Sequence, residues 1–400
     1  MIVLSGATLV LPDRLLSPGT LVIENGRIAE IRPDVPSAGS HAHFAFHDHY
    51  IVPAFIDVHV HGVDGVDTLD ELPDRDSIAK IAAVLPRYGV SAFCPTTVAC
   101  EPEALRRVLD QVRRARQNPD VGAARVLPAH LESNFINPEY AGAQPVRCLR
   151  VPTEESRLDG EFTAVDILRE IERAAPDVGI VTVAPELDGG LELIRWLAPR
   201  VRLVSLGHSA ATYDQALEAI GAGARHATHL FNRMPPLGHR APGLAGAVLQ
   251  SEEVAAELIC DAHHVHPAMI RTAVAAKQPA RVFAITDGTA VSGLPVGSRA
   301  RLGGRTITAG SSGALLEDGT LAGSTLTMEG AFQTLIGRIG VSIIDAATLC
   351  ATTPARELGL VGHGMLATEA VADLVVLDAM FSVVQTYIGG QLVYSRKSEV

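Results

Sequence analysis

Residues 55–62 read FIDVHVHG, an apolar run that ends with two histidines one residue apart. Alternate residues of a strand point to the same side, so a strand ending here would direct the rings of His59 and His61 towards one point. Neutral imidazole is a common ligand of Zn²⁺, and catalytic zinc sites keep one coordination position open for water. Isolated H-x-H pairs that bind nothing are also frequent, so the pattern alone leaves both interpretations open.

Seven similar apolar runs follow, separated by segments with helical patterning. Short apolar runs that alternate with helix-length segments are typical of βα units around a parallel sheet. The segment 76–89 has such patterning, the segment 101–116 has a proline near its start, and the segment 212–223 begins with Thr212 and ends with glycine. Eight units over about 250 residues predict a TIM-type (β/α)₈ barrel, an α/β fold. The predicted strands are 54–60, 90–94, 124–131, 179–184, 202–207, 224–230, 255–260 and 281–286.

Both ends of the chain show a different pattern, in which short β-like runs are joined by turns. Asn25-Gly26 separates two apolar runs near the N-terminus, and Gly389-Gly390 separates two near the C-terminus; both are strong hairpin signals. We therefore expect a small β-sandwich domain formed from both chain termini, with the barrel inserted between its halves. The predicted boundaries are 1–52 and 356–400 for the β-sandwich and 53–355 for the barrel.

The composition excludes several classes of protein. The chain has 400 residues, of which 47% are hydrophobic, and a formal net charge of −12, which disfavours a nucleic-acid partner. The N-terminus lacks the basic start and long apolar core of a signal peptide, and no uninterrupted apolar run reaches membrane-spanning length. Five widely spaced cysteines without a C-x-x-C pair predict reduced thiols. We expect a cytoplasmic protein that acts on a small molecule and has no membrane partner.

Ionisable side chains follow the ends of most predicted barrel strands. Catalytic groups of such barrels come from the C-terminal ends of several strands, so these side chains are expected to meet at one mouth. The strongest candidates for metal ligands are Glu132, His208 and His229, because each closes an apolar run and precedes small or turn-favouring residues. The full set is His59, His61, Glu132, His208, His229, Asp261 and Asp287.

Asp287 lies in the segment AITDGT, directly after the last predicted strand. A carboxylate in this position can take a proton from a metal-bound water and later return it to a leaving nitrogen. The alternative is a strand-end aspartate that caps the following helix. The metal-ligand candidates at neighbouring strand ends favour the proton-transfer role.

A second histidine-rich stretch, HAHFAFHDHY, lies before the first barrel strand. It belongs to the predicted β domain, and carboxylates or histidines at other strand ends are not positioned to complete a metal shell around it. We therefore interpret this stretch as a surface strand or loop. Its histidines are His41, His43, His47 and His49.

Seven segments, in order along the chain, resemble the motifs of the N-acetylglucosamine-6-phosphate deacetylase family, a branch of the amidohydrolase superfamily. The resemblance implies a metal-dependent (β/α)₈ barrel with a small β-sandwich, commonly dimeric, that removes acetate from the 2-amino group of a sugar phosphate. It extends from about residue 50 to residue 330. The segments are PAFIDVHVHGVDG, HLESNFINPEYAGAQP, LGHSAAT, THLFNRMPPLGHRAPGLAG, DAHHVHP, TDG and DGTLAGSTLTM.

The resemblance also implies roles for individual residues. Asp287 would be the acid and base, taking a proton from the attacking water and giving one to the departing amine. The cofactor would be a divalent metal, Zn²⁺ in our prediction, with one or two ions per subunit. The implied ligands are Glu132, His208 and His229 for the principal ion, and His59 and His61 for a second.

The substrate pocket is likewise implied by the resemblance. Arg240 and His264 would face the phosphate, with Arg240 supplied by the neighbouring subunit of a homodimer. A guanidinium group binds phosphate oxygens in pairs, which suits this role, although a solvated loop arginine is the alternative for Arg240 taken alone. The predicted substrate-binding residues are Ala143, Gln144, Asn232, Arg233, Arg240, His264, Leu321, Ala322 and Gly323.

The chain departs from the family pattern at four places. Gln144 replaces a histidine, and its amide can donate a hydrogen bond but cannot carry charge. Three hypotheses therefore stay open: a deacetylase of N-acetyl-D-glucosamine 6-phosphate, a deacetylase of another N-acyl amino sugar phosphate such as N-acetylgalactosamine 6-phosphate, and a non-catalytic sugar-phosphate binder. The other departures are Ser133-Asn134 for Gly-Pro, Arg233 for a small residue and Ala262 for glycine.

Overall fold

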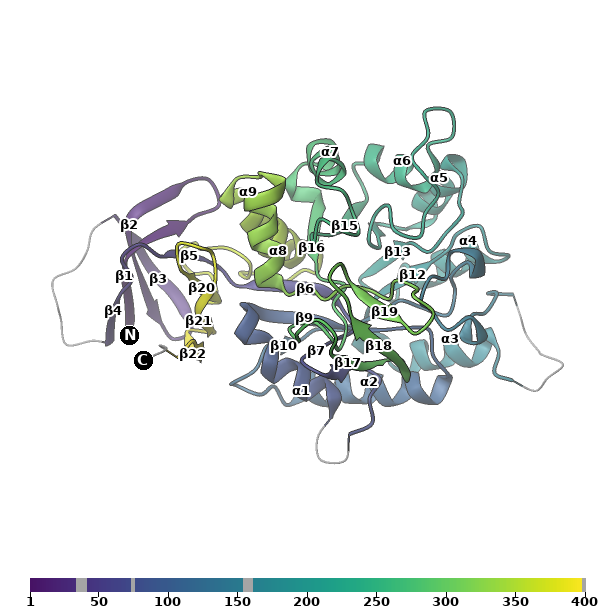
Figure 1. Ribbon diagram of the computed structural model, residues 1–400, viewed down its shortest axis with the longest axis horizontal. Coiled ribbons are helices and arrows are strands. Elements are labelled where there is room, and N and C mark those ends of the chain that lie inside the picture. Colours follow the sequence, from purple (N-terminus) through teal and green to yellow (C-terminus); the bar gives the residue numbers. More distant parts are fainter. Residues whose placement is uncertain (34–41, 73–75, 154–160, 398–400) are drawn as a thin grey trace.

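The computed structural model of the chain describes residues 1–33, 42–72, 76–153 and 161–397. Within these ranges a large barrel lies beside a smaller sheet, and the two ends of the chain lie close together in that sheet (Figure 1). The predicted α/β fold, a barrel with a β domain built from both termini, is confirmed.

Eight parallel strands form the barrel, in the order β9-β11-β12-β13-β14-β15-β16 with β6 beside β9. Hydrogen bonds beyond the ends of the strands connect the last strand to the first: the backbone N–H of Asp287 donates to the carbonyl oxygen of His59 at 2.9 Å, and that of His61 donates to Gly288 at 2.7 Å. The strands are β6 Phe55–Val60, β9 Val90–Thr97, β11 Ala129–Leu131, β12 Val178–Val183, β13 Leu203–Leu206, β14 His226–Ala227, β15 Ala255–Ile259 and β16 Val282–Ile285.

These strands are short and buried along their whole length, as parallel strands between a helical layer and a packed interior must be. The predicted third strand, 124–131, is interrupted by Pro128, which lacks the N–H that a sheet needs. The residues before it form β10 Arg125–Val126, which pairs with β9. The predicted sixth strand, 224–230, is paired only at His226–Ala227, so its last residues are free to turn into the mouth of the barrel.

Helices connect the strands and begin where the sequence predicts. Helix α2 has Pro102 at its first position, where the missing N–H costs nothing. Helix α5 begins with a capping box in which Thr212 and Gln215 each accept a backbone N–H of the other, and it ends at Gly223. The helices are α1 Ser77–Val84, α2 Pro102–Gln117, α3 Ala164–Arg173, α4 Gly190–Leu197, α5 Tyr213–Ala222, α6 Gly243–Gln250, α7 Pro267–Lys277, α8 Met328–Thr334, α9 Ile343–Ala347 and α10 Thr353–Glu357.

The terminal strands form one mixed sheet in the order β22-β21-β20-β5-β1-β2-β3, with β4 paired to β1, and they share a separate apolar core. Both predicted hairpins are present: Asn25 and Gly26 have φ values of 50° and 78°, and Gly389 and Gly390 have 56° and 74°, the left-handed conformations that such turns require. The domain boundaries remain a prediction. The strands are β1 Ile2–Val10, β2 Leu15–Glu24, β3 Arg27–Arg32, β4 Ala42–Ala45, β5 Tyr50–Pro53, β20 Leu374–Leu377, β21 Val383–Ile388 and β22 Gln391–Ser395.

Two small sheets border the mouth of the barrel. The hairpin of β7 Gly62–Val63 and β8 Val66–Asp67 follows the first barrel strand. After the last barrel strand the chain forms β17 Arg299–Leu302, β18 Arg305–Ala309 and β19 Ala314–Leu316, an insertion that the sequence analysis did not anticipate. Ala314 and Gly323 are hydrogen-bonded at 3.0 Å, which fixes the predicted Leu321-Ala322-Gly323 turn against this sheet.

A buried carboxylate joins the barrel to the terminal sheet. Asp373, just before β20, accepts two hydrogen bonds from Arg125 of β10, at 2.5 and 2.9 Å. The same carboxylate accepts the backbone N–H of Gly389 at 2.7 Å and contacts Nδ1 of His363 at 2.8 Å. Arg125 of the barrel and three positions of the C-terminal segment therefore meet at one side chain.

All five cysteines are buried as free thiols, as the sequence predicts. Over the described ranges, the helices are too short or too polar to cross a lipid bilayer.

Candidate active site

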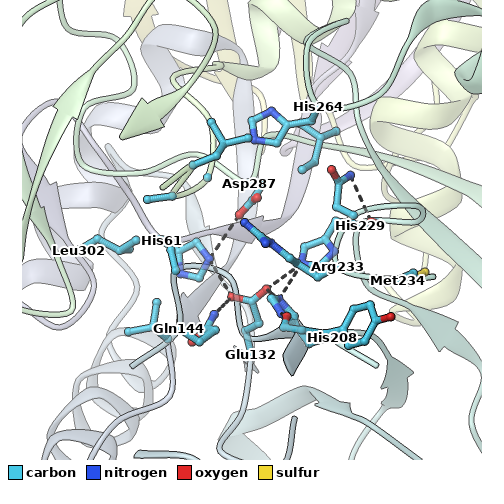
Figure 2. Close-up of a pocket in the computed structure, with 18 of the residues that line it drawn as sticks. His61, Glu132, Gln144, His208, His229, Arg233, Met234, His264, Asp287 and Leu302 are labelled. Carbon is cyan, nitrogen blue, oxygen red and sulfur yellow. Dashed lines mark hydrogen bonds and ion pairs between the residues drawn. The ribbon is translucent and has the colours of Figure 1, made fainter. Parts of the chain in front are cut away.

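Glu132, His208 and His229 meet at the C-terminal mouth of the barrel (Figure 2). Glu132 directly follows β11, and the two histidines lie two residues beyond β13 and β14. Oε1 of Glu132 is 2.7 Å from Nε2 of His208 and 2.8 Å from Nε2 of His229, and the two nitrogens are 3.0 Å apart. All three side chains are buried. The three predicted principal ligands therefore present their donor atoms to one position.

The chemistry of these donors fits a divalent cation. Nδ1 of His208 donates to the carbonyl oxygen of Tyr140 at 2.8 Å, which leaves the lone pair of Nε2 directed at the cluster. Burial by itself raises the pKa of the Glu132 carboxyl, but His208 and His229 hold that pKa well below its usual value, so the group is a carboxylate. One carboxylate oxygen and two imidazole nitrogens are a donor set that Zn²⁺ binds.

A second group of donor atoms adjoins the first and consists of His59, His61 and Asp287. Nε2 of His59 is 3.3 Å from Nε2 of His61, and each of these nitrogens is 3.4 Å from Oδ1 of Asp287. The other oxygen of Glu132, Oε2, is 3.4 Å from Nε2 of His61. The H-x-H pair thus directs both rings to one point, and Glu132 lies between the two groups.

Three of these residues have backbone conformations that are rare for side chains with a Cβ atom. The φ angles are 48° at His208, 28° at His229 and 47° at Asp287. A left-handed conformation costs about 1–2 kcal/mol for such a residue, and such strain concentrates at functional sites. Each residue lies two positions beyond its strand, so this turn brings the side chain from the barrel wall into the mouth.

The cluster forms the floor of a pocket of about 410 Å³. The walls include Tyr140, Phe231, Met234 and Leu302, the last from the inserted sheet. Arg240 is exposed and lies outside this lining. The predicted substrate-binding residues that do line the pocket are Ala143, Gln144, Asn232, Arg233, His264, Leu321, Ala322 and Gly323.

Both ends of the Gln144 amide are occupied by protein groups. Its oxygen accepts the backbone N–H of Ala99 at 2.8 Å, and its nitrogen donates to Oε2 of Glu132. The other departures after Glu132 also have structural partners: Ser133 donates to the carbonyl oxygen of Thr182 at 2.5 Å, and Asn134 donates to two backbone carbonyls. These residues hold the Glu132 loop in place.

Arg233 is an exposed cation in the pocket wall, with φ of 52° (Figure 2). Its side chain lies against Gly142, where a Cβ atom would be only 2.5 Å from Nε of Arg233. Its carbonyl oxygen accepts the backbone N–H of Ser209 at 3.1 Å, next to His208. Glycine at position 142 therefore leaves the space that the guanidinium stem occupies.

His264 is oriented by Asp261, the ionisable residue that follows β15. Nδ1 of His264 is 2.6 Å from Oδ2 of Asp261, whose Oδ1 accepts the backbone N–H groups of His263 and His264. Burial raises the pKa of Asp261, but its bonds with His264 outweigh burial and lower the pKa overall. Asp261 thus contributes to the mouth by holding His264, and among the described residues it belongs to none of the groups that could hold a metal.

Sequence reasoning missed the polar residues beneath the site, inside the barrel. Glu257, His130 and His226 are completely buried on strands β15, β11 and β14. Nδ1 of His59 is 2.8 Å from Oε2 of Glu257. A charged residue in the middle of the apolar run AAELIC is the signal that could have identified Glu257, because a buried carboxylate requires partners.

The upstream histidines behave as predicted for a surface strand. Nε2 of His43, on β4, is 2.7 Å from the hydroxyl of Ser5, and His47 is exposed. Among the residues described, the clusters able to hold a metal include neither of these nor His49. His41 lies outside the described residues.

Comparison with known proteins supports the same family as the motifs. The chain matches the amidohydrolase family over residues 50–393. The chain belongs to the amidohydrolase family. This amidohydrolase is 34% identical over 392 residues to N-acetylgalactosamine-6-phosphate deacetylase of Escherichia coli O157:H7, covering 98% of both chains. It is 35% identical over 390 residues to human N-acetylglucosamine-6-phosphate deacetylase, covering 95% of this chain and 90% of that one.

Solved structures agree with this placement. The amidohydrolase superposes on a mutant of N-acetyl-D-glucosamine-6-phosphate deacetylase from Mycobacterium smegmatis in complex with N-acetyl-D-glucosamine-6-phosphate, with a TM-score of 0.87, 31% identity and coverage of 98% and 99% of the two chains. The enzyme of Thermotoga maritima gives a TM-score of 0.84 at 29% identity, with coverage of 99% and 100%. The resemblance read from the seven motifs is confirmed.

Proposed function

We propose that this protein hydrolyses the acetamide of N-acetyl-D-glucosamine 6-phosphate to glucosamine 6-phosphate and acetate. The observation that carries the proposal is the convergence of Glu132, His208 and His229 on one point, with Asp287 lining the same pocket. The similarity to deacetylases over nearly the whole chain supports it.

The proposed cofactor is Zn²⁺, held by Glu132, His208 and His229, with a second subsite at His59 and His61. A bound divalent cation would polarise the amide carbonyl and lower the pKa of water from 15.7 to about 7. The chain's part is to present donors in a buried site from which bulk water is largely excluded. Gln144 would fix the rotation of the Glu132 carboxylate through the bond to Oε2.

Asp287 is the proposed acid and base. Its carboxylate lines the pocket and lies beside the ligand groups, within reach of a water on the attacking side. It would take the proton of that water and then give a proton to the departing amine. The backbone N–H of Asp287 donates to the carbonyl oxygen of His59, and its carbonyl oxygen accepts the backbone N–H of Ser324. These two bonds fix the backbone and so keep the carboxylate directed at the reacting centre.

The phosphate of the substrate would be bound at the opposite end of the pocket. His264 offers its Nε2, which has no protein partner among the described residues, and Arg233 offers a guanidinium group. Asn232 and the turn at 321–323 would contact the sugar. Because the protein carries a net charge of −12, cations must be gathered locally to hold a phosphate dianion.

We further propose a cytoplasmic homodimer in which Arg240 reaches the phosphate of the neighbouring subunit. Arg240 is exposed on the loop between His229 and α6, which suits a residue that acts across an interface. The free state of all five cysteines supports the cytoplasm, where thiols stay reduced.

N-acetylgalactosamine 6-phosphate is the second candidate substrate. The observation that favours it is the 34% identity, over 98% of both chains, to the E. coli N-acetylgalactosamine-6-phosphate deacetylase. The two sugars differ only in the configuration at one hydroxyl, so the chemistry at the amide is the same for both.

The deciding experiment is acetate release by zinc-loaded protein from the two epimeric 6-phosphates and from their unphosphorylated forms. We expect the highest kcat/KM on N-acetyl-D-glucosamine 6-phosphate. A higher kcat/KM on the galactose epimer would transfer the assignment to that substrate. If zinc-loaded protein bound a sugar phosphate but released no acetate from any of them, the third hypothesis, a non-catalytic binder, would replace both.

A further inference from the structure

Glu257 connects the two groups of ligand candidates from below. It is completely buried on β15, in the barrel interior. Its Oε2 atom is 2.8 Å from Nδ1 of His59 and accepts the backbone N–H of His229 at 3.1 Å. A single carboxylate oxygen thus holds one residue of the His59, His61 and Asp287 group and one residue of the Glu132 group.

The bond to Glu257 fixes the tautomer of His59. When Glu257 is ionised it can only accept, so Nδ1 of His59 then carries the hydrogen and Nε2 presents its lone pair. That lone pair faces the point shared with His61 and Asp287, at 3.3 and 3.4 Å. Carboxylates that orient a metal-binding imidazole in this way also raise its basicity as a ligand.

The other histidines of the site are held differently. Nδ1 of His208 donates to a backbone carbonyl, and within the described part of the chain Nδ1 of His61 and of His229 are buried without a hydrogen-bond partner. Glu257 is therefore a specific support for the ring of His59 and not one example of a general pattern. Its loss should affect the His59 group more than the Glu132 group.

Among the described residues, Glu257 forms no ion pair with a lysine or an arginine. Its second oxygen, Oε1, is 3.7 Å from Nδ1 of His130 and 3.7 Å from Nε2 of His226, and the described residues give it no hydrogen bond. The ion pairs of Glu257 within those residues are all with histidines. A buried carboxylate in such surroundings is costly unless a cation lies nearby. A metal ion at the His59 group would supply that cation.

We propose that Glu257 is a positioning residue that prepares the group of His59, His61 and Asp287 to hold a second divalent cation, and that it acts through the ring of His59. The proposal rests on the proposed function, which assigns the first ion to Glu132, His208 and His229 and a second subsite to His59 and His61. It predicts two ions per chain in the zinc-loaded protein.

The test is a zinc titration of metal-free protein, with bound zinc counted per chain by mass spectrometry after equilibrium dialysis. Wild type should bind two ions. Glu257→Gln keeps the shape of the side chain but removes its charge, and we expect it to keep the first ion and to bind the second ten- to a hundredfold more weakly, the range usual for partners that orient a ligand. Circular dichroism of the metal-free proteins checks that the variant is folded.

Asp57→Asn is the matched control. Asp57 is also a buried carboxylate in the barrel, and it contacts the backbone N–H of His59 at 3.3 Å but neither ring nitrogen. We expect this variant to bind both ions with wild-type affinity. The single variant His59→Gln and the double variant His59→Gln/Glu257→Gln complete a double-mutant cycle. If Glu257 acts through His59, the double variant binds zinc as tightly as His59→Gln alone.

Several results would overturn the proposal. One ion in wild type, unchanged affinity for the second ion in Glu257→Gln, an equal loss in Asp57→Asn, or a further loss in the double variant would each do so. Should Glu257→Gln fail to fold, Glu257→Asp withdraws the carboxylate from the ring and must also weaken the second ion. If wild-type protein bound only one ion but still released acetate, the proposal for Glu257 would fail while the proposed function would stand. Failure of the one can therefore be distinguished from failure of the other.

Discussion

The last strand of the barrel is joined to the first by a contact between Asp287 and His59. The backbone N–H of Asp287 donates to the carbonyl oxygen of His59 at 2.9 Å, and Oδ1 of Asp287 is 3.4 Å from Nε2 of the same histidine. The backbone bond closes the barrel, and the side chains meet at the same place in the candidate site. Closure of the fold therefore fixes the distance between the proposed proton carrier and the ligand group.

Replacement of Asp287 by asparagine should abolish turnover while the ion of the Glu132 group stays bound. Asparagine fits the same space and keeps the backbone bond to His59, but its amide cannot accept the proton of a water. We expect a fall in kcat of about 10²- to 10⁴-fold, the usual contribution of a positioned acid or base. Acetate release measures the rate, and zinc content on the same sample shows that the Glu132 group is still loaded. Asp318→Asn, on an exposed turn of the inserted sheet, is the control and should retain full activity.

Near-normal turnover by Asp287→Asn would remove the proton-transfer role from this residue. A parallel loss of zinc from the Glu132 group would show that the fall in turnover comes from loss of the first ion and not from loss of proton transfer.

Chelation should remove activity and lower stability together. The donor atoms of Glu132, His208 and His229 come from three strands and converge only in the folded chain, so the ion binds the native state and stabilises it. At a free ion concentration one hundred times Kd the gain is about 2.7 kcal/mol. Dialysis against dipicolinate followed by readdition of Zn²⁺, with activity and melting temperature recorded at each step, checks both effects. Full turnover in protein shown to be free of metal would contradict the proposed cofactor.

Substitution of either arginine assigned to the phosphate, Arg233 or Arg240, should weaken binding of the phosphorylated substrate. A hydrogen bond to a charged group contributes about 1.5–3 kcal/mol, which corresponds to roughly tenfold to a hundredfold in affinity. We expect Arg233→Ala to raise KM for the 6-phosphate by that factor and to change KM for the unphosphorylated sugar little. Arg240→Ala should do the same. The measurement is the ratio of kcat/KM values on the two substrates.

A surface arginine provides the control for that comparison. Arg195 lies on α4, is exposed, and pairs with Glu192 at 3.2 Å, so Arg195→Ala should leave both KM values unchanged. If Arg233→Ala weakened the phosphorylated and unphosphorylated sugars equally, the phosphate contact would be wrong. If Arg240→Ala raised KM for the phosphorylated sugar in the dimer but had no effect on KM in a monomeric form of the protein, Arg240 would be located at the interface.

Much of the fold was predictable because its signals are local. The turns at Asn25-Gly26 and Gly389-Gly390 require left-handed residues, and the sequence supplies them where the structure uses them. The ligand candidates were visible because Glu132, His208 and His229 each stand directly after an apolar run. In a parallel barrel every such position falls at one rim, so chain order alone brings them together.

The contacts that hold the ligands were not predictable, because they depend on long-range packing. Glu257 and Gln144 are separated from their partners His59 and Glu132 by 198 and 12 residues, and no local pattern links them. The inserted sheet at 299–316 was missed because its strands are short and half exposed. The predicted strand 124–131 included Pro128, although proline interrupts a strand. In the structure one strand ends before Pro128 and another begins after it.

The contact of Asp373 with Arg125 and His363, between the barrel and the terminal sheet, should make the free energy of unfolding depend on pH. Burial raises the pKa of this carboxyl, but His363 and Arg125 more than offset burial, and the pKa in the folded protein is lowered overall. Because the pKa of Asp373 is lower in the folded than in the unfolded protein, its stabilising effect is complete at pH values above the unfolded-state pKa of about 3.9. The effect is lost as the pH falls through the folded-state pKa. The side chain of Arg125 is 32% exposed, so loss of its bonds to Asp373 should cost about 1.5–3 kcal/mol, and Asp373→Asn should unfold at lower urea concentration at pH 7.

The difference between Asp373→Asn and wild type should begin to shrink below about pH 4, where the unfolded chain takes up the proton, and should disappear only when the folded carboxyl is neutral as well. Urea unfolding midpoints from pH 3 to pH 8 measure this. Glu30→Gln is the control: Glu30 pairs with Arg32 at 3.2 Å on the exposed face of β3, and such pairs contribute at most about 1 kcal/mol. A destabilisation by Asp373→Asn that stayed constant across the acid range would show that the residue acts through packing alone, since only its charge confers the pH dependence.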